Sequence, residues 1–376
     1  MSKLELYLQK KIKDRQLAGN LRQLKIAAAP IDLFSNDYLG LVTTGVLPAL
    51  ISKKYGTSLA TGSTGSRLLS GNSVIAEMLE QNIATFHDVE AALLFNSGYD
   101  ANVGLLSAIA DRHTTYIYDE LCHASIIDGI RLSQAQVHYK YRHNDIADLQ
   151  EKINLAKEGP VIVVTESVFS MDGDMAPLQN IAGICMQYNA SLVIDEAHAT
   201  GVFGNQGKGL VHAQSIATQT FARIHTYGKA MGCHGAAVVG STVLKQYLIN
   251  FARSFIYTTA LPEHTLCAIE CAYGYLGSSV YSNEVLHDLV AYFRKQVAGS
   301  NIKGWNNSSS PIQALVIGNN ERTRHIAGIL QQDGLQVNAI LSPTVPAGSE
   351  RLRICLHTFN TYEQIDLLLK ILATHL

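Results

Sequence analysis

The chain has 376 residues, of which 47% are hydrophobic and 16% charged, with a formal net charge of -2. This length favours one large α/β domain with a smaller companion, and the absence of a basic stripe argues against a nucleic-acid-binding protein. No stretch reaches the roughly 20 apolar residues of a membrane span, and the N-terminus lacks the pattern of a signal peptide. We therefore expect a cytoplasmic protein that does not act in the membrane.

The six cysteines lack the spacing of a metal site or of a disulfide framework. None of them forms a Cys-x-x-Cys pair, and Cys267 and Cys271 stand four apart in a helical pattern without further ligands nearby. Such a set indicates reduced thiols, as in a cytoplasmic protein, and predicts no metal centre.

The predicted elements begin with a helix whose solvated face carries the basic residues 10–15. Short apolar runs then alternate with stretches long enough for crossover helices. The predicted strands cover residues 92–95, 115–118, 161–164, 192–194, 223–225 and 236–239. This alternation predicts an α/β fold with a mostly parallel central sheet and helices on both faces. Sites in such folds lie beyond the carboxyl ends of the strands.

The last hundred residues predict a smaller C-terminal α+β domain. Helices are expected over residues 286–296 and 322–332, and strands over 312–317 and 351–356. A capping box at Asn360-Thr361-Tyr362-Glu363 is expected to open a final helix. The domain boundaries predicted from this pattern are an N-terminal helical arm over 1–34, a large domain over 35–265 and a small domain over 266–376.

One candidate site residue, Asp195, ends a predicted buried strand and is followed shortly by His198. A buried carboxylate without a partner is costly, so Asp195 is either functional, a helix cap or one half of an ion pair. His198 alone has an ordinary structural explanation as a hydrogen-bonded core histidine.

A second candidate is Lys229, which follows another predicted strand. It lies among Gly228, Gly232 and Gly235, in a stretch with no other Asp, Glu, Lys or Arg over residues 224–239. Most lysines lie at the surface, but a lysine in apolar surroundings is either desolvated or used covalently. A carboxylate and a lysine at neighbouring strand ends suit a cofactor that acts as an electron sink.

Two further segments follow predicted strands. Ser97-Gly98-Tyr99 forms a turn that opens a predicted helix, where backbone N–H groups favour a phosphate, although such turns are common. His123 follows the strand over 115–118; its imidazole could stack on a planar ring or be structural.

Seven segments together resemble the α-oxoamine synthase group of fold-type I pyridoxal-phosphate (PLP) enzymes, in content and in order, over nearly the whole chain. They cover residues 35–41, 61–72, 97–99 with 123–125, 165–174, 195–201, 225–230 and 343–353. The resemblance implies a PLP-dependent acyltransferase with the fold of that group.

The resemblance also assigns roles to individual residues. Lys229 is similar to the Schiff-base lysine, Asp195 to the partner of the pyridinium nitrogen, and His123 to the ring-stacking histidine that assists proton transfer. The remaining residues implied to bind the cofactor are His198, Ser170, Thr226, Ser97, Gly98, Tyr99, Thr258 and Thr259. Thr258 and Thr259 resemble a segment that reaches the phosphate of a neighbouring subunit, which implies a homodimer with shared active sites.

Members of the group join an amino acid to an acyl thioester carried by coenzyme A or an acyl carrier protein, and release carbon dioxide. Asn36 and Arg353 resemble the groups that receive the amino-acid carboxylate, and Arg22 and Thr344 resemble contacts to the substrate. The resemblance is closest to biotin-pathway members, which use L-alanine and a pimeloyl thioester. One departure is Leu341, which lies in a segment where some of those members carry an arginine. The alternatives are a 2-amino-3-ketobutyrate ligase and a long-chain acyl homologue.

Overall fold

The computed structural model describes residues 1–24, 26, 29–56, 58–156 and 158–376, which form two compact units. The larger unit contains Asp37–Ser170 and Met175–Asn283; the smaller contains Met1–Asn36, Met171–Asp174 and Glu284–Leu376. These units differ from the boundaries expected from sequence. The helix that begins at residue 263 belongs wholly to the larger unit, because it packs on helices that precede the sheet, and the N-terminal segment belongs to the smaller one.

The larger unit is built on a seven-stranded sheet with the strand order β2-β8-β7-β6-β5-β3-β4. Every neighbouring pair is parallel except the two that include β8. The prediction of a mostly parallel central sheet is therefore confirmed. The strands are β2 (Ala91–Phe95), β3 (Thr115–Asp119), β4 (Val137–Tyr141), β5 (Val161–Glu166), β6 (Ser191–Asp195), β7 (Ala222–Thr226) and β8 (Ala236–Gly240).

The sequence pattern predicted all of these strands except β4. This strand lies at the edge of the sheet, and only its last residue is buried. Its sequence, Val-His-Tyr-Lys-Tyr, therefore lacks the continuous apolar run by which the buried central strands were recognised. By contrast, β2 and β3 are buried at every position.

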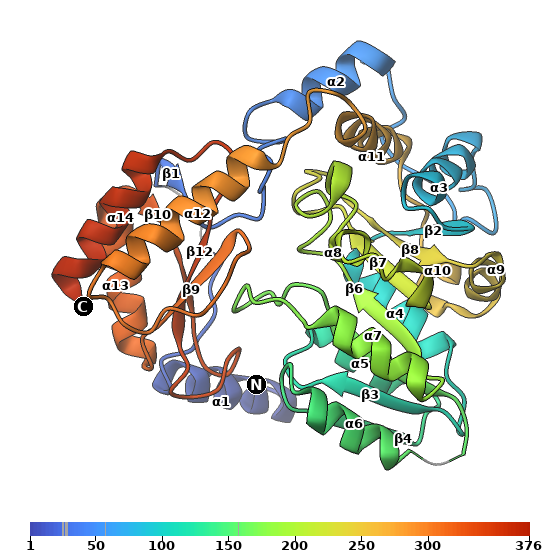
Figure 1. Cartoon of the computed structure of the whole chain (residues 1–376), viewed down its shortest axis with the longest axis horizontal. Helices are drawn as coiled ribbons and strands as arrows, with labels where there is room; N and C mark the ends of the chain where they lie inside the picture. The colour runs from blue at the N-terminus through green and yellow to red at the C-terminus, as the bar shows by residue number, and fades with distance from the viewer. Residues whose placement is uncertain (25, 27–28, 57, 157) are drawn as a thin grey trace. The chain divides into compact units, whose positions relative to one another are not determined.

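Helices cover the sheet of the larger unit. Helix α4 packs against β2, β7, β8 and α5, while α6 packs against β3 and β4, and α7 against β6 (Figure 1). Several begin at a side-chain cap, such as Ser73 for α3 and Ser97 for α4. The helices are α2 (Val46–Tyr55), α3 (Val74–Phe86), α4 (Gly98–Ala108), α5 (Ala124–Leu132), α6 (Ile146–Asn154), α7 (Leu178–Gln187), α8 (Leu210–Ala213), α9 (Thr242–Phe251), α10 (Arg253–Ile256) and α11 (Glu263–Leu276), with short 3-10 turns at Asn205–Gly207 and Ala217–Gln219.

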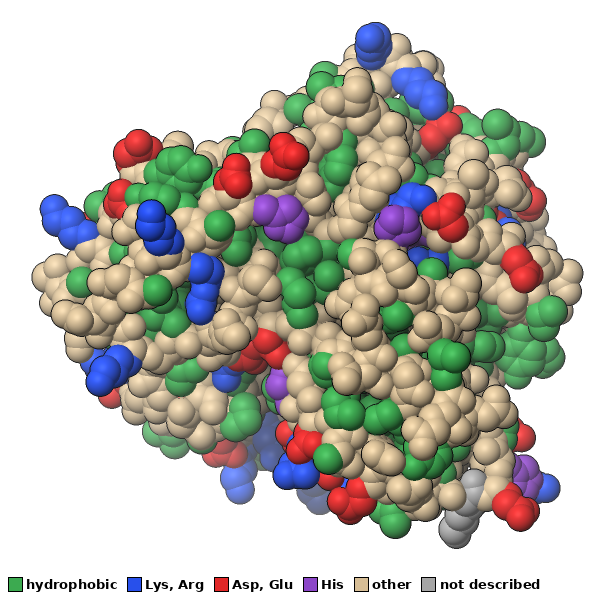
Figure 2. All heavy atoms as spheres, viewed as in Figure 1, with side chains coloured by type: hydrophobic (Ala, Val, Ile, Leu, Met, Phe, Trp, Pro, Cys, Tyr) green, Lys and Arg blue, Asp and Glu red, His purple; other side chains and the backbone are tan. Residues whose placement is uncertain are grey.

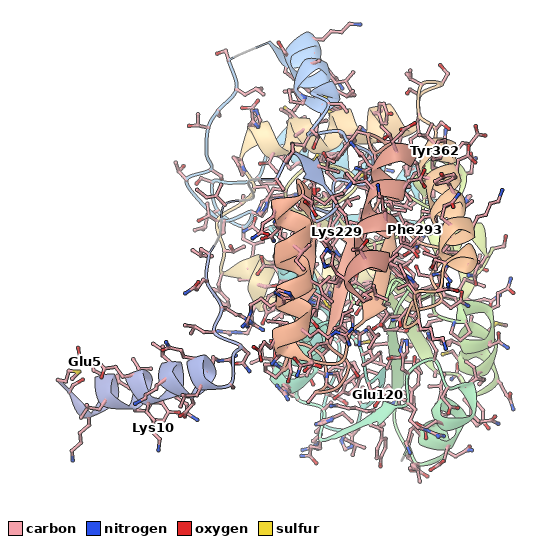
Figure 3. The ribbon with its side chains drawn as sticks, turned by 90° about the vertical axis from the view of Figure 1, so that its left-hand side faces the viewer. Glu5, Lys10, Glu120, Lys229, Phe293 and Tyr362 are labelled. Carbon is pink, nitrogen blue, oxygen red and sulfur yellow. The ribbon has the colours of Figure 1, made fainter. Side chains whose placement is uncertain are left out.

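The smaller unit contains a three-stranded antiparallel sheet in the order β11-β12-β9 and a short parallel pair, β1 with β10. Helices α12 and α14 pack together, and the rings of Tyr292 and Tyr362 meet at 4.3 Å between centroids (Tyr362 is labelled in Figure 3). The elements are α1 (Lys3–Leu17), β1 (Ile31–Asp32), α12 (Glu284–Gly299), β9 (Ile312–Val316), α13 (Asn320–Gln332), β10 (Leu335–Gln336), β11 (Asn338–Ile340), β12 (Arg351–Cys355) and α14 (Tyr362–His375).

The two ends of the smaller unit differ in how they are held. The final helix opens with a capping box and buries an apolar face, but the box is formed by Thr361 and Gln364, one position after the predicted segment 360–363. The first helix also has a capping box, at Ser2 and Glu5, but none of its residues is buried. Figure 3 labels Glu5 and Lys10 on this exposed helix.

The surface carries both signs of charge. On the face drawn in Figure 2, Lys and Arg side chains are interspersed with Asp and Glu, in keeping with the net charge of -2. Within the described part of the chain, no helix is both long enough and apolar enough to cross a bilayer. The six cysteines, all within that part, are free thiols.

Candidate active site

The candidate site begins where three neighbouring strands of the larger unit end. Glu166 ends β5, Asp195 ends β6 and Thr226 ends β7. The parallel register pairs Glu166 directly with Asp195. Two carboxyl groups therefore lie side by side at the carboxyl edge of the sheet, which is where open α/β sheets bind their ligands.

Asp195 is only 5% exposed, and polar donors hold its carboxylate. Its Oδ2 accepts a hydrogen bond from Nδ2 of Asn102 at 2.7 Å, and its Oδ1 accepts one from the backbone N–H of Ala197 at 2.9 Å. These bonds compensate part of the cost of burying a polar group. They also fix the direction in which the carboxylate points.

Glu166, beside it, is 3% exposed. Burial, together with the negative charge of Asp195, raises the pKa of Glu166 to about 8. Glu166 therefore holds a proton at neutral pH more readily than an ordinary glutamate does. Glu166 Oε1 also accepts a short hydrogen bond, 2.6 Å, from the backbone N–H of His123.

His123 is the N-cap of helix α5 and has an exposed side chain. Its Nδ1 lies 2.7 Å from Oγ of Ser125 and accepts the backbone N–H of that residue at 3.2 Å. Partial desolvation lowers the pKa of His123; the charge of Asp195 opposes this shift and that of Lys229 adds to it. His123, Asp195 and Lys229 are thus near enough to influence one another's charge.

Lys229 follows β7 and lies in a tight turn. The turn is closed by backbone hydrogen bonds from Tyr227 N to Gly235 O, from Cys233 N to Tyr227 O and from Gly232 N to Lys229 O. Gly232 and Gly235 have φ values of 64° and 106°, which other residues rarely adopt. The lysine (labelled in Figure 3) is half-buried, and its charge also lowers the pKa of Glu166.

A narrow cradle lies between the N-terminus of α4 and the end of β7. A Cβ atom on Gly98 would lie 2.3 Å from Oγ1 of Thr226, so only glycine allows this approach. Ser97 caps the helix by accepting the backbone N–H of Asp100 at 3.1 Å. The first turn of α4 and the Thr226 hydroxyl can therefore bind a phosphate together, which fits the predicted group.

The structure places the remaining cofactor candidates in the same unit. His198 is buried, and its Nδ1 lies 2.8 Å from the hydroxyl of Tyr38. Thr258 and Thr259 are tied to Asn96, next to Ser97, by bonds of 2.8 and 2.9 Å from the Asn96 amide. Tyr99 donates a hydrogen bond to Asp128, and Ser170 is half-buried at the end of this unit.

The four substrate candidates all lie in the smaller unit, and they form two pairs. Nη2 of Arg353 donates to Oδ1 of Asn36 at 3.0 Å, and Arg353 is 6% exposed. Nη2 of Arg22 donates to Oγ1 of Thr344 at 3.0 Å. Each pair joins residues more than 300 positions apart in the sequence. The first pair consists of the two residues that resemble the carboxylate-binding groups, and the second of the two that resemble substrate contacts.

Sequence reasoning missed three residues of the site: Asn102, Ser125 and Glu166. All three lie in or beside segments that carry the family resemblance, but none was given a role. Only Glu166 offered a signal, since it ends a predicted buried strand as Asp195 does. Asn102 and Ser125 sit inside helices, and nothing in their local sequence indicates that they meet.

Comparison with known proteins agrees with this geometry. The family model for aminotransferase class I and II matches residues 28–372. The chain is 41% identical to an 8-amino-7-oxononanoate synthase from Emericella nidulans, over 93% of this chain and 90% of that one. Among solved structures, an 8-amino-7-oxononanoate synthase from Francisella tularensis is 30% identical with a TM-score of 0.77, covering 92% of this chain and 97% of that one. A serine palmitoyltransferase from S. paucimobilis, solved with PLP bound, is 26% identical with a TM-score of 0.87 over 100% and 98%.

These matches and the strand-end site define the class of protein as a PLP-dependent transferase of fold type I. The chain belongs to the aminotransferase class I and II family and, within it, to the α-oxoamine synthase group near the 8-amino-7-oxononanoate synthases.

Proposed function

We propose that the chain joins L-alanine to a pimeloyl thioester and releases 8-amino-7-oxononanoate, carbon dioxide and a free thiol, a step of biotin biosynthesis. The observation that carries this proposal is the combination of 41% identity over almost the whole chain with an intact strand-end site around Lys229 and Asp195. The thiol carrier is either coenzyme A or an acyl carrier protein, and the working unit is a homodimer.

The cofactor, when bound, supplies an aldehyde for amines and a ring that delocalises a carbanion. Nζ of Lys229 would hold that aldehyde covalently. Asp195 is proposed to face the ring nitrogen and keep it protonated, because its carboxylate is buried and fixed by two donors. The Gly98–Thr226 cradle is proposed to bind the phosphate, with Ser97 and Tyr99 on one side and the partner subunit's threonine segment on the other.

The substrate steps follow from the same residues. Arg353 and Asn36 receive the carboxylate of alanine, since a guanidinium binds a carboxylate with two parallel hydrogen bonds. Lys229 Nζ removes the Cα proton of alanine and later returns a proton to the product. His123 covers the ring and donates a proton at the acyl carbonyl oxygen. Arg22 and Thr344 contact the acyl donor.

The test is a product assay on the purified enzyme. With alanine and pimeloyl thioesters of coenzyme A and of carrier protein, we expect equal amounts of thiol and carbon dioxide, and 8-amino-7-oxononanoate by mass spectrometry. Lys229→Ala should lose both activity and the visible colour of the cofactor, whereas Lys140→Ala, at an exposed lysine of β4, should keep both. Absence of product with alanine and either thioester contradicts the proposal.

A second candidate is a long-chain acyl homologue, favoured by the TM-score of 0.87 with serine palmitoyltransferase. The same assay with serine and palmitoyl-coenzyme A separates the two. The higher identity to the biotin-pathway relative, 41% against 26%, predicts that alanine with the pimeloyl thioester is the faster pair.

A further inference from the structure

A continuous hydrogen-bonded path joins Asp195 to His123 through two residues that have no role so far. Nδ2 of Asn102 donates both to Asp195 at 2.7 Å and to Oγ of Ser125 at 3.0 Å. Oγ of Ser125 lies 2.7 Å from Nδ1 of His123. Asn102 and Ser125 are buried almost completely, at 1% and 0% exposed, so water does not compete for these bonds.

The direction of each bond in this path follows from its first member. An ionised carboxylate only accepts, so the group of Asn102 that faces Asp195 must be its NH2. The same NH2 group donates to Ser125, whose hydroxyl proton is then left to donate to Nδ1 of His123. The backbone N–H of Ser125 also points at that nitrogen, at 3.2 Å. Nδ1 of His123 is therefore an acceptor, and the ring proton lies on Nε2.

The amide of Asn102 shows that this arrangement has a cost. Its Oδ1 is buried without a hydrogen-bond partner among the described residues. An unsatisfied buried acceptor destabilises the folded state. An apolar residue would avoid that cost, so the side chain is better explained by what its two N–H bonds hold than by its contribution to packing.

We propose that Asn102 and Ser125 are positioning residues that hold His123 as the neutral tautomer with its proton on Nε2. They do so by linking its Nδ1 through hydrogen bonds to the carboxylate of Asp195. This inference rests on the proposed roles of His123 and Asp195. The Nε2 proton is then available on the exposed edge of the ring, where His123 would act on the acyl oxygen. The path also makes the charge on Asp195 a condition for that tautomer.

The charged groups around His123 also act on its pKa. Asp195 and Asp128 favour its protonation, and Lys229 opposes it. Glu166 binds the backbone N–H of His123 rather than its ring. Removing the Ser125 hydroxyl leaves these groups in place and takes away the closer of the two donors to Nδ1, so only the backbone N–H at 3.2 Å remains. The protonated form of His123 then becomes easier to reach.

Two variants test the path with a matched control. Ser125→Ala removes the hydroxyl donor to Nδ1 and leaves only the longer backbone N–H bond, and Asn102→Leu removes the link to Asp195. Leu105→Ala is the control, because Leu105 lies on the same helix as Asn102 and is fully buried but apolar. One hydrogen bond of about 1 kcal/mol corresponds to a little under one pH unit. We expect the limb of the pH–rate profile that His123 sets to move up by about half to one pH unit in both variants and to stay in place in the control.

A second readout follows His123 without turnover. Enzyme labelled with ¹⁵N-histidine, with the His123 signals assigned by their loss in His123→Asn, should show Nε2 protonated and Nδ1 bare in the wild type. Ser125→Ala should give a mixture of forms. A wild-type Nδ1 that carries the proton, or a His123-dependent limb of the pH–rate profile that coincides in wild type and both variants, overturns the inference. A wild type that turns over neither substrate pair would instead overturn the proposed function, and the ¹⁵N result would still decide the tautomer.

Discussion

Two stacked histidines in the larger unit should make the folded protein less stable in mild acid. His87 and His225 are fully buried, and their rings lie 3.8 Å apart between centroids. Burial lowers the pKa of both well below the ordinary value of 6.5, and each is further lowered by the positive charge of Arg223 nearby. Each ring also has one buried nitrogen without a partner among the described residues, so a second proton would find no acceptor.

The direction of this change in stability follows from comparing how the folded and unfolded chains bind protons. In the unfolded chain both histidines take a proton below a pH of about 6.5, whereas in the folded chain they stay neutral. The unfolded state then binds more protons, so stability is full above that pH and falls as the pH drops below it. One pKa unit corresponds to about 1.4 kcal/mol, so at about pH 5 each histidine costs up to about 2 kcal/mol and the pair up to about 4 kcal/mol.

The assay is urea denaturation of the cofactor-loaded enzyme at several pH values between about 5 and 7.5. His87→Phe keeps an aromatic ring in the stack but removes one titrating group, so the slope of unfolding free energy against pH should fall by the contribution of one histidine, up to about 1.4 kcal/mol per pH unit. Comparing slopes rather than absolute values removes the cost of the lost bond from His87 to Tyr273. His113→Gln, at an exposed imidazole, is the control and should keep the wild-type slope. The reasoning fails if wild type and His87→Phe show the same slope.

Three further predictions concern the site and its scaffold. Gly98→Ala should weaken PLP binding on the order of tenfold in an equilibrium dialysis measurement, because the added methyl group collides with Thr226 and overpacking costs about 1–3 kcal/mol. Gly183→Ala, on an exposed face of α7 with open space around it, should instead raise the free energy of unfolding by about 0.5–1 kcal/mol with PLP affinity unchanged. Arg353→Lys should raise KM for alanine on the order of tenfold while the PLP spectrum stays the same, since lysine cannot offer two parallel bonds to a carboxylate; an unchanged KM would remove Arg353 from the proposed carboxylate site.

Much of the architecture is determined by local sequence. Several of the buried central strands, such as β2 and β8, are continuous apolar runs, as expected for strands buried on both faces. Strand β7 is an exception, because it buries Arg223 and His225. Positions at strand ends follow from the same pattern, which is why Asp195 and Lys229 could be identified as candidates before the fold was known. The strand missed in the seven-stranded sheet, β4, lies at its edge, where half-exposed residues weaken the signal. The short strands β1, β10 and β11 of the smaller unit were not predicted either.

The tertiary structure decided which polar groups meet. Asp195 could have been a helix cap or an ion-pair partner by sequence, and only folding brings it against the amide of Asn102, 93 positions away. The pairs Arg353–Asn36 and Arg22–Thr344 likewise form only in the folded chain, because their members lie more than 300 residues apart in the sequence. The sequence by itself determined the fold class and the cofactor and indicated Lys229 as the candidate to hold it, because these depend on local periodicity and on segments of fixed order. The raised pKa of Glu166 and the hydrogen-bonded path from Asp195 to His123 depend on burial and on distances through space, which no local pattern encodes.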